Sequence, residues 1–272
     1  MVFQEKNVLV ADVSVVIPTH NRLQDLNRSL ASVYKQKRLP IEIIVVDDGS
    51  TLPVSTNIFD RGPASINYVL LRNDISKGAN CARNRGIDAA TGKYIAFLDD
   101  DDIWASKKLD LQFEVMESKQ LDLCYSGKQI VTFDVYHDEL LRRYSFAVPK
   151  FNDMRKSIMH QNFIGTTSSI MVKKSSLIGV GGFDVAMPAL QDYELYIRLI
   201  FSGYKIAGVS APLLDYSIYK EKSAISKSLR KGITATKLLL VKHRNKDYFC
   251  NLIWSQVIVI LKKTVLRLRA YL

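Results

Sequence analysis

The first hundred residues alternate short runs of β-forming residues with segments of helical length, and this order constrains the fold more than any other feature. The sequence predicts strands at Val13–Ile17, Ile41–Val46, Ile66–Leu71 and Tyr94–Leu98. It predicts helices between them at Leu23–Gln36, Val54–Phe59 and Ala79–Ala90. Because such an alternation is typical of βαβ units, we expect an α/β fold with a single Rossmann-like, mostly parallel sheet flanked by helices.

The second half of the chain is less regular. It predicts strands at Leu121–Tyr125, Lys128–Phe133, Ser168–Lys173, Lys205–Val209 and Leu213–Ile218. It predicts helices at Lys107–Ser118 and Gln191–Phe201, and a loop or short helix at Asn152–His160. With 47% hydrophobic residues and three distant cysteines, the chain can build its core without disulfides, and a reducing, cytosolic setting fits best.

Polar turns follow three of the predicted strands. They are Pro18-Thr19-His20-Asn21, Asp47-Asp48-Gly49-Ser50 and Asp99-Asp100-Asp101-Asp102. In open parallel sheets, ligands bind beyond the carboxyl ends of the strands. We therefore expect the chemistry of this chain at that edge.

The four consecutive aspartates of the last turn repel one another and need positive charge nearby. A divalent cation supplies it, because Mg²⁺ and Mn²⁺ prefer oxygen ligands and are often shared with substrate phosphates. The Asp-x-Asp spacing directs Asp99 and Asp101 to the same side of an extended segment. The alternative is a solvated acidic turn that caps the next helix.

The other two turns are ambiguous when each is taken alone. Asp48 offers an acceptor suited to the N–H of a base, but Asp-Gly is also a common plain turn. Pro18 presets the backbone, and Asn21 is in the position of a cap for the following helix.

Taken together, these segments resemble the family-two glycosyltransferases of the GT-A fold, which transfer a sugar from a nucleotide diphosphate sugar. The resemblance covers roughly residues 12–218. It rests on the segments 15–22 (VVIPTHNR), 44–50 (IVVDDGS), 78–87 (GANCARNRGI), 92–104 (GKYIAFLDDDDIW), 181–184 (GGFD) and 191–198 (QDYELYIR).

The resemblance implies a role for each turn in binding the donor. Thr19 and Asp48 would contact the base, within a nucleotide-sugar site that includes Pro18 and Asn21, and Asp100 would contact the ribose. Asp99 and Asp101 would hold Mn²⁺ or Mg²⁺ on the diphosphate. Arg83 is a candidate diphosphate ligand, although an arginine on an exposed helix face is a nearly equal alternative.

The resemblance also implies the residues on the acceptor side. Asp192, in the Gln-Asp pair that opens a helix, would be the general base of an inverting enzyme, and its alternative role is to favour the helix dipole. Glu194 is the alternative acid, on a different face. His160 and Asn162 fall where this family shapes the acceptor pocket. His20 and His243 are expected to be ordinary surface or turn histidines.

The net charge of +11 is very unevenly distributed. Residues 1–214 hold 25 Lys and Arg against 24 Asp and Glu, whereas residues 215–272 hold 13 against 3. We therefore expect a nearly neutral catalytic domain at 1–218 and a basic, helical tail at 219–272, with helices at 223–243 and 247–269. Its mixture of apolar and basic residues favours an anionic membrane surface. The alternatives are a hairpin packed on the body and a contact with a second subunit.

The sequence thus favours an inverting, metal-dependent glycosyltransferase with a UDP sugar as the preferred donor and a lipid-linked glycan or glycolipid as the acceptor. The longest apolar run, Leu252–Leu261, is about half the ~20 residues of a membrane span, so we expect a cytoplasmic enzyme held peripherally at the inner membrane. A metal-dependent nucleotidyltransferase is one alternative, but the turn at residues 18–21 lacks the expected glycine-rich loop. A nucleic-acid-binding protein is another, but the apolar runs of the tail fit it poorly, and we expect no nucleic-acid partner.

Overall fold

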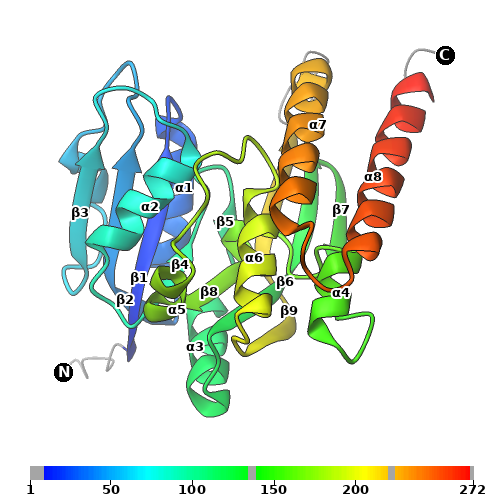
Figure 1. Ribbon diagram of the computed structural model, residues 1–272. Helices are drawn as coiled ribbons and strands as arrows, with labels where there is room; N and C mark the ends of the chain where they lie inside the picture. Colours follow the sequence, from blue (N-terminus) through cyan, green and yellow to red (C-terminus); the bar gives the residue numbers. More distant parts are fainter. Residues whose placement is uncertain (1–8, 134–138, 220–223, 270–272) are drawn as a thin grey trace, which may run out of the picture.

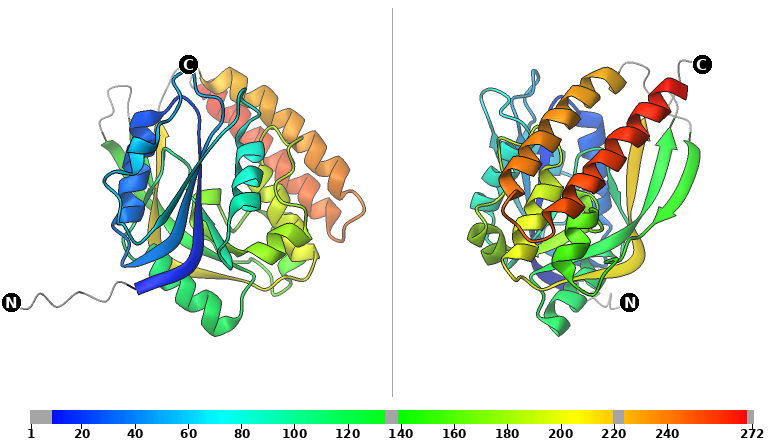
Figure 2. Two further views of the ribbon diagram at one scale, coloured as in Figure 1. Left: turned by 90° about the vertical axis from the view of Figure 1, so that its left-hand side faces the viewer. Right: turned by 45° about the vertical axis from the view of Figure 1, so that its right-hand side comes forward.

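A nine-stranded sheet with helices on both faces forms the centre of the structure (Figures 1 and 2). The computed structural model describes residues 9–133, 139–219 and 224–269. The strands are β1 (Leu9–Thr19), β2 (Arg38–Asp47), β3 (Asn67–Arg72), β4 (Tyr94–Phe97), β5 (Ile103–Trp104), β6 (Leu123–Phe133), β7 (Glu139–Ser145), β8 (Ile170–Lys173) and β9 (Ile206–Tyr219). The α-helices are α1 (Leu23–Tyr34), α2 (Ala79–Ala89), α3 (Lys108–Lys119), α4 (Met154–His160), α5 (Lys174–Gly179), α6 (Gln191–Phe201), α7 (Ala224–His243) and α8 (Phe249–Arg269), with short 3-10 turns at Thr56–Phe59 and Thr167–Ser169.

The order of the strands across the sheet is β3-β2-β1-β4-β8-β6-β9-β5, and β7 pairs with β6. The four strands from the first hundred residues pair in parallel, as the βαβ pattern predicts. The other half is mixed: β8 runs antiparallel to both β4 and β6, whereas β6 and β9 are parallel. The α/β fold is therefore as predicted, with antiparallel strands added on one side of the parallel half.

Two pairs of predicted strands are single strands in the structure. β6 continues through Ser126 and Gly127, and β9 continues through the segment 210–212, with register shifts between the two strands at this point. A Cβ atom on Gly127 would lie 2.6 Å from the carbonyl oxygen of Ser210, so glycine permits this close approach. The small and polar residues had suggested a break in each strand. They instead mark an irregularity in the pairing of two continuous strands, β6 and β9.

Three short elements escape the sequence analysis. β5 contains two residues, β7 carries charged residues, and α5 directly follows β8. None of the three shows the periodicity that reveals a longer element. β5 and β7 form through pairing with β9 and β6, which are distant in sequence.

Strands β1, β2 and β4 of the parallel half are largely buried on both faces. Val13, Val15 and Ile17 of β1 belong to one apolar cluster, and Val16 between them belongs to the other. Strands covered on both faces lack polar alternation, which explains the continuous apolar runs in the sequence. This packing fixes the carboxyl ends of β1, β2 and β4 at one edge.

Helices α7 and α8 are packed against the body of the protein. Ala235 and Leu239 of α7 and Leu252 of α8 are fully buried in the same apolar cluster as residues of α4 and α6. α8 also contacts α4, and the two long helices lie beside each other in Figures 1 and 2. No helix in the described ranges is sufficiently long and apolar to cross a bilayer.

A buried lysine lies behind the acidic turn. Lys108 is 0% exposed, its Nζ donates to Oε1 of Gln112 and it lies 4.9 Å from the centre of the Trp104 ring. Gln112 in turn donates to the carbonyl oxygens of Cys124 and Ser169. Burial lowers the pKa of Lys108 to about 7, so the folded protein holds this amine neutral at alkaline pH.

We predict that Lys108 makes folding more favourable as the pH rises from about 7 to about 10. In this window the unfolded state binds the proton and the folded state does not, so the free energy of unfolding gains about 1.4 kcal/mol per pH unit relative to Lys108→Met. Urea unfolding of both proteins at several pH values measures the difference. Equal pH dependences for the two proteins would contradict a neutral, buried Lys108.

Candidate functional site

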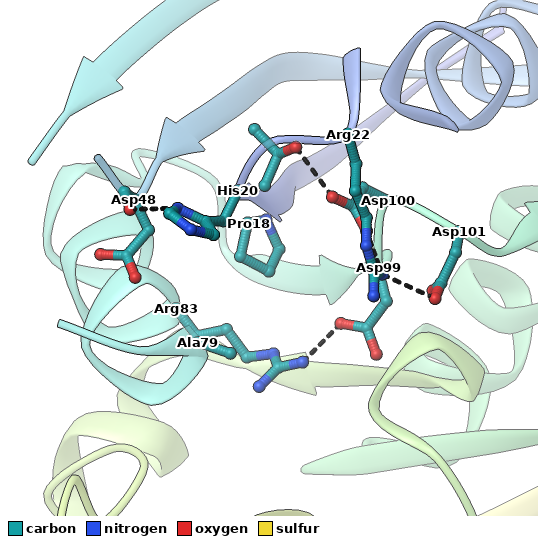
Figure 3. Close-up of a pocket in the computed structure, with 10 residues that line it drawn as sticks. Pro18, His20, Arg22, Asp48, Ala79, Arg83, Asp99, Asp100 and Asp101 are labelled. Carbon is teal, nitrogen blue, oxygen red and sulfur yellow. Dashed lines mark hydrogen bonds and ion pairs between the residues drawn. The ribbon is translucent and has the colours of Figure 1, made fainter. Parts of the chain in front are cut away.

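A cavity of about 320 Å³ lies at the carboxyl ends of β1, β2 and β4 (Figure 3). Its position is the edge at which the sequence analysis placed the chemistry. The residues that line it are Pro18, Thr19, His20, Arg22, Asp48, Ala79, Arg83, Asp99, Asp100 and Asp101. Three turns and the beginning of α2 therefore converge on one site.

The acidic turn is surrounded by two arginines. Nη2 of Arg83 donates to Asp99 at 2.5 Å. Nη1 of Arg22 donates to Asp101 at 2.8 Å and to Asp100 at 3.2 Å. These contacts, drawn in Figure 3, show that the turn recruits positive charge from two different elements. A simple solvated cap for the next helix does not require this arrangement.

The carboxylates remain under electrostatic strain even with these partners. Burial raises the pKa of Asp100 to about 6, although Thr19 and Arg22 oppose the change. Burial and the charge of Asp99 also raise the pKa of both Asp101 and Asp102. Oδ2 of Asp102 has no hydrogen-bond partner among the described residues. The turn therefore favours an additional cation.

Arg83 points into the cavity from α2 and is only 4% exposed, which excludes the exposed helix-face alternative. One of its nitrogens bonds Asp99, but Nε and Nη1 are buried and have no hydrogen-bond partner within the described part of the chain. An unsatisfied guanidinium in a protein interior is costly unless a ligand completes its hydrogen bonds. Its planar donors match the geometry of a phosphate.

Asp48 is already extensively bonded in the structure. Its carboxylate accepts from Nδ2 of Asn73, from Oγ of Ser76 and from the backbone N–H groups of Lys77 and Gly78. Burial alone would raise the pKa of Asp48, but these hydrogen bonds outweigh it and lower the pKa. Asp48 therefore organises the 73–78 loop at the rim of the cavity.

The turn after β1 differs in detail from its prediction. Pro18 and Thr19 line the cavity, and Oγ1 of Thr19 donates to Asp100 at 2.8 Å. Asn21 does not cap α1: its backbone has a φ of 56°, and its Oδ1 accepts from the N–H of Thr51. The asparagine, in the left-handed conformation that this residue type tolerates, thus bonds the loop after β2.

Asp192 is the second residue of α6 and does not line the cavity. Burial raises the pKa of this carboxyl, while the N–H of Tyr193 and the charges of Arg83 and Lys128 oppose the change. Asp99 and Arg83, which line the cavity, therefore also influence the pKa of Asp192. A carboxylate with a raised pKa near a ligand cavity is suited to accept a proton.

Glu194, the alternative acid, makes its hydrogen bonds on a different face of α6. It accepts from Arg198 at 2.7 to 2.9 Å, and Nε2 of His243 lies 3.5 Å from it. His243 is buried at the end of α7, so the prediction of a surface or turn histidine is wrong. Arg198 also donates to the carbonyl oxygens of Val180 and Gly182. Glu194 therefore helps to fix the turn before α6, whereas Asp192 remains the acid near the cavity.

The two candidate acceptor residues make local contacts. Nε2 of His160 lies 3.0 Å from Nζ of Lys150, and Asn162 closes a turn with the backbone of Gly165. Neither lines the cavity. The turn that Asn162 closes leads to Ser168, whose Oγ accepts from the N–H of Asp99.

Sequence reasoning missed Arg22 and His20 as site residues. Both line the cavity; Nδ1 of His20 lies 2.8 Å from the carbonyl oxygen of Asp48. The sequence indicated Arg22 only by its position: it directly follows the turn at residues 18–21, at the sheet edge that also carries the four aspartates. His20 carried no such signal, because its contact depends on the pairing of β1 with β2.

No group of three or more His, Cys, Asp and Glu side chains within the described ranges forms a ready metal site. Asp99 and Asp101 provide two carboxylates, and a cation there would need further oxygens from a bound substrate. Mg²⁺ and Mn²⁺ often bind in this way. The raised pKa values of Asp100, Asp101 and Asp102 make the turn compatible with such an ion.

The fold and the site together define an α/β protein of the GT-A class. A crystal structure of TarS from S. aureus superposes with a TM-score of 0.65 and 17% identity, covering 89% of this chain and 70% of that one. The family model for glycosyl transferase family 2 matches residues 14–181. The chain therefore belongs to glycosyl transferase family 2 and is a glycosyltransferase.

Curated relatives agree with this assignment. A glycosyltransferase of Methanocaldococcus jannaschii is 28% identical over 88% of this chain and 82% of its own length. The UDP-Glc:alpha-D-GlcNAc-diphosphoundecaprenol beta-1,3-glucosyltransferase WfgD of Escherichia coli is 34% identical, over 44% of this chain and 46% of its own. The putative teichuronic acid biosynthesis glycosyltransferase TuaG of Bacillus subtilis is 25% identical over 79% of this chain and 82% of its own.

Proposed function

We propose that this chain is an inverting glycosyltransferase that moves one sugar from a nucleotide diphosphate sugar to a hydroxyl of a growing, lipid-linked surface polysaccharide or glycolipid. The observation that carries this proposal is the buried, partly unpartnered Arg83 facing the acidic turn in a cavity at the sheet edge. A UDP sugar is the favoured donor. The name of WfgD, and a crystal structure of TarS in complex with UDP-GlcNAc, support a donor of this class.

In this proposal the cavity holds the nucleotide and the diphosphate. Pro18, Thr19 and Asp100 line the cavity. Pro18 and Thr19 would bind at the base, and Asp100 would contact the ribose. Because the oxygens of Asp48 already accept four donors, Asp48 contributes mainly by fixing the 73–78 loop around the base. Arg83 would complete its hydrogen bonds with diphosphate oxygens.

The acceptor would approach from the side of α6. Asp192 takes the proton of the attacking hydroxyl as the bond between the anomeric carbon and the diphosphate oxygen breaks. Attack opposite the leaving group inverts the configuration of the anomeric carbon. Mn²⁺ or Mg²⁺ held by Asp99 and Asp101 would offset the charge that develops on the leaving diphosphate.

We also propose that the acceptor is presented at an anionic membrane surface, on its cytoplasmic face. The lipid-linked substrate in the name of WfgD supports an acceptor of this kind. The three described cysteines are free, in keeping with a reducing compartment.

A panel of nucleotide sugars, with and without Mn²⁺, tests the donor assignment. We expect a selective increase in melting temperature and slow hydrolysis with one UDP sugar. Arg83→Met should weaken UDP binding by on the order of 10- to 100-fold, because it removes charge-assisted hydrogen bonds. The control Lys119→Met removes an exposed cation from α3 and should bind normally. Equal binding by Arg83→Met and the control would contradict the proposed diphosphate site.

A further inference from the structure

One face of α8 presents a stripe of apolar side chains to solvent. We call it the outer stripe; it consists of Ile253, Trp254, Val257, Ile258 and Leu261. Trp254 is 69% exposed and Leu261 is 58% exposed. The spacing of these residues places them along one side of a helix. Surface residues of this kind are common singly, but a continuous row marks an interaction site.

The opposite side of α8 contains polar residues. Ser255 and Gln256 are buried beside Leu252, and Oγ1 of Thr236 on α7 lies 3.4 Å from Oε1 of Gln256. A helix stabilised only by its own protein would normally bury its large apolar residues and expose its polar ones. Much of the described part of α8 instead exposes large apolar residues and buries polar ones. Its outer stripe therefore requires an apolar environment that this protomer does not provide.

The charge of α7, α8 and the loop between them indicates which environment this is. Residues 224–269 contain eleven Lys and Arg and a single acid, Asp247. Two copies of α8 pairing through their outer stripes would bring these like charges together. An anionic bilayer instead supplies negative charge and an apolar layer beneath it.

The direction of α8 relates this surface to the active site. In Figure 1, its C-terminal end lies at the edge toward which β2 and β3 point, and the beginning of β1 lies at the opposite edge. This edge is where the carboxyl ends of the parallel strands form the cavity. The sequence of that end of α8 carries Lys262, Lys263, Arg267 and Arg269.

We propose that the outer stripe of α8 inserts into the interface of an anionic membrane, while α7 and the inner side of α8 remain packed on the body. This inference names the surface that performs the membrane contact suggested under the proposed function, and it rests on that function only for the identity of the acceptor. Because Ala235, Leu239 and Leu252 are part of the core, the surface is tested by substitutions in the full chain and not by removing α7 and α8.

Flotation of the full chain with vesicles tests the surface directly. We expect binding to phosphatidylcholine vesicles that contain phosphatidylglycerol, and weak binding to phosphatidylcholine alone. Ile258→Ser with Leu261→Ser should reduce binding by at least about tenfold. The control Ile178→Ser with Val185→Ser removes two apolar residues that are each 60% exposed, on α5 and in the loop before α6, and should bind normally.

Trp254 provides an independent readout. Because Trp104 is buried, a blue shift of fluorescence on vesicle addition should come from Trp254 and should be lost in Trp254→Phe. Equal vesicle binding by the outer-stripe variant and its control would overturn the proposal. A dimer in solution that the outer-stripe variant converts to a monomer would also overturn it, in favour of a second copy as the occupant.

Separate measurements distinguish a failure of the membrane proposal from a failure of the proposed enzymatic function. Hydrolysis of a nucleotide sugar in solution, without vesicles, should be the same in the outer-stripe variant and in the unmodified protein. Loss of vesicle binding with normal hydrolysis supports the membrane surface. Vesicle binding without turnover of any nucleotide sugar would instead contradict the proposed enzymatic function and leave the outer stripe supported.

Discussion

Replacing Asp192 with asparagine should lower the rate of sugar transfer by on the order of 10²- to 10⁴-fold, the usual contribution of a general base. The substitution preserves the shape of the side chain but removes its ability to accept the proton of the acceptor hydroxyl. Donor binding should remain nearly normal, because the residues that line the cavity are unchanged. Steady-state transfer rates and calorimetric binding of UDP measure the two effects separately.

The pH profile provides a second readout of the same residue. Because burial raises the pKa of Asp192, kcat/KM should fall as the pH falls through that pKa, at a higher pH than for an ordinary aspartate. The control Asp88→Asn removes an exposed carboxylate from α2 and should leave the profile unchanged. A normal transfer rate in Asp192→Asn would reassign the base.

Replacing Asp101 with asparagine should decrease metal-dependent turnover by on the order of 10²- to 10³-fold. The change removes one of the two carboxylates proposed to hold the ion and also weakens the contact with Arg22. Titration with Mn²⁺ should show a weaker apparent metal affinity as well as a lower maximal rate.

Asp60→Asn is the matched control for this variant, since Asp60 is exposed and distant in sequence from the acidic turn. It should respond to Mn²⁺ as the unmodified protein does. If Asp101→Asn shows the same response to the metal as this control, Asp101 is not a ligand, and the role of the acidic turn would be to bind the arginines alone.

Local patterns in the sequence were sufficient to predict the parallel half of the sheet and its helices. β1, β2 and β4 are apolar runs that end in polar turns, and each signal lies within a few residues. β5 and β7 could not be predicted in this way, because they depend on partners distant in the chain. The same distinction applies to β6 and β9, whose continuity depends on their pairing with each other.

The site shows a similar division. The acidic turn could be selected from residue type and spacing, whereas Arg83 was a candidate only through the resemblance; the structure places the two together. Two other features could not be predicted: the hydrogen bonds that occupy the carboxylate of Asp48, and the hydrogen bond between Asn21 and Thr51. Both depend on how the loops that follow β1, β2 and β3 meet. His160 and Asn162 were selected from the resemblance alone, and their observed contacts are with Lys150 and Gly165.

The packing of α7 and α8 has a consequence for synthesis of the protein. Leu239 and Leu252 complete the apolar cluster built on α4 and α6, yet they follow the last strand in the chain. A nascent chain that has reached only the end of β9 therefore leaves part of this cluster open to water, and transiently exposed apolar surface promotes aggregation. Ribosome-bound intermediates that end before residue 235 should consequently be strong substrates for chaperones.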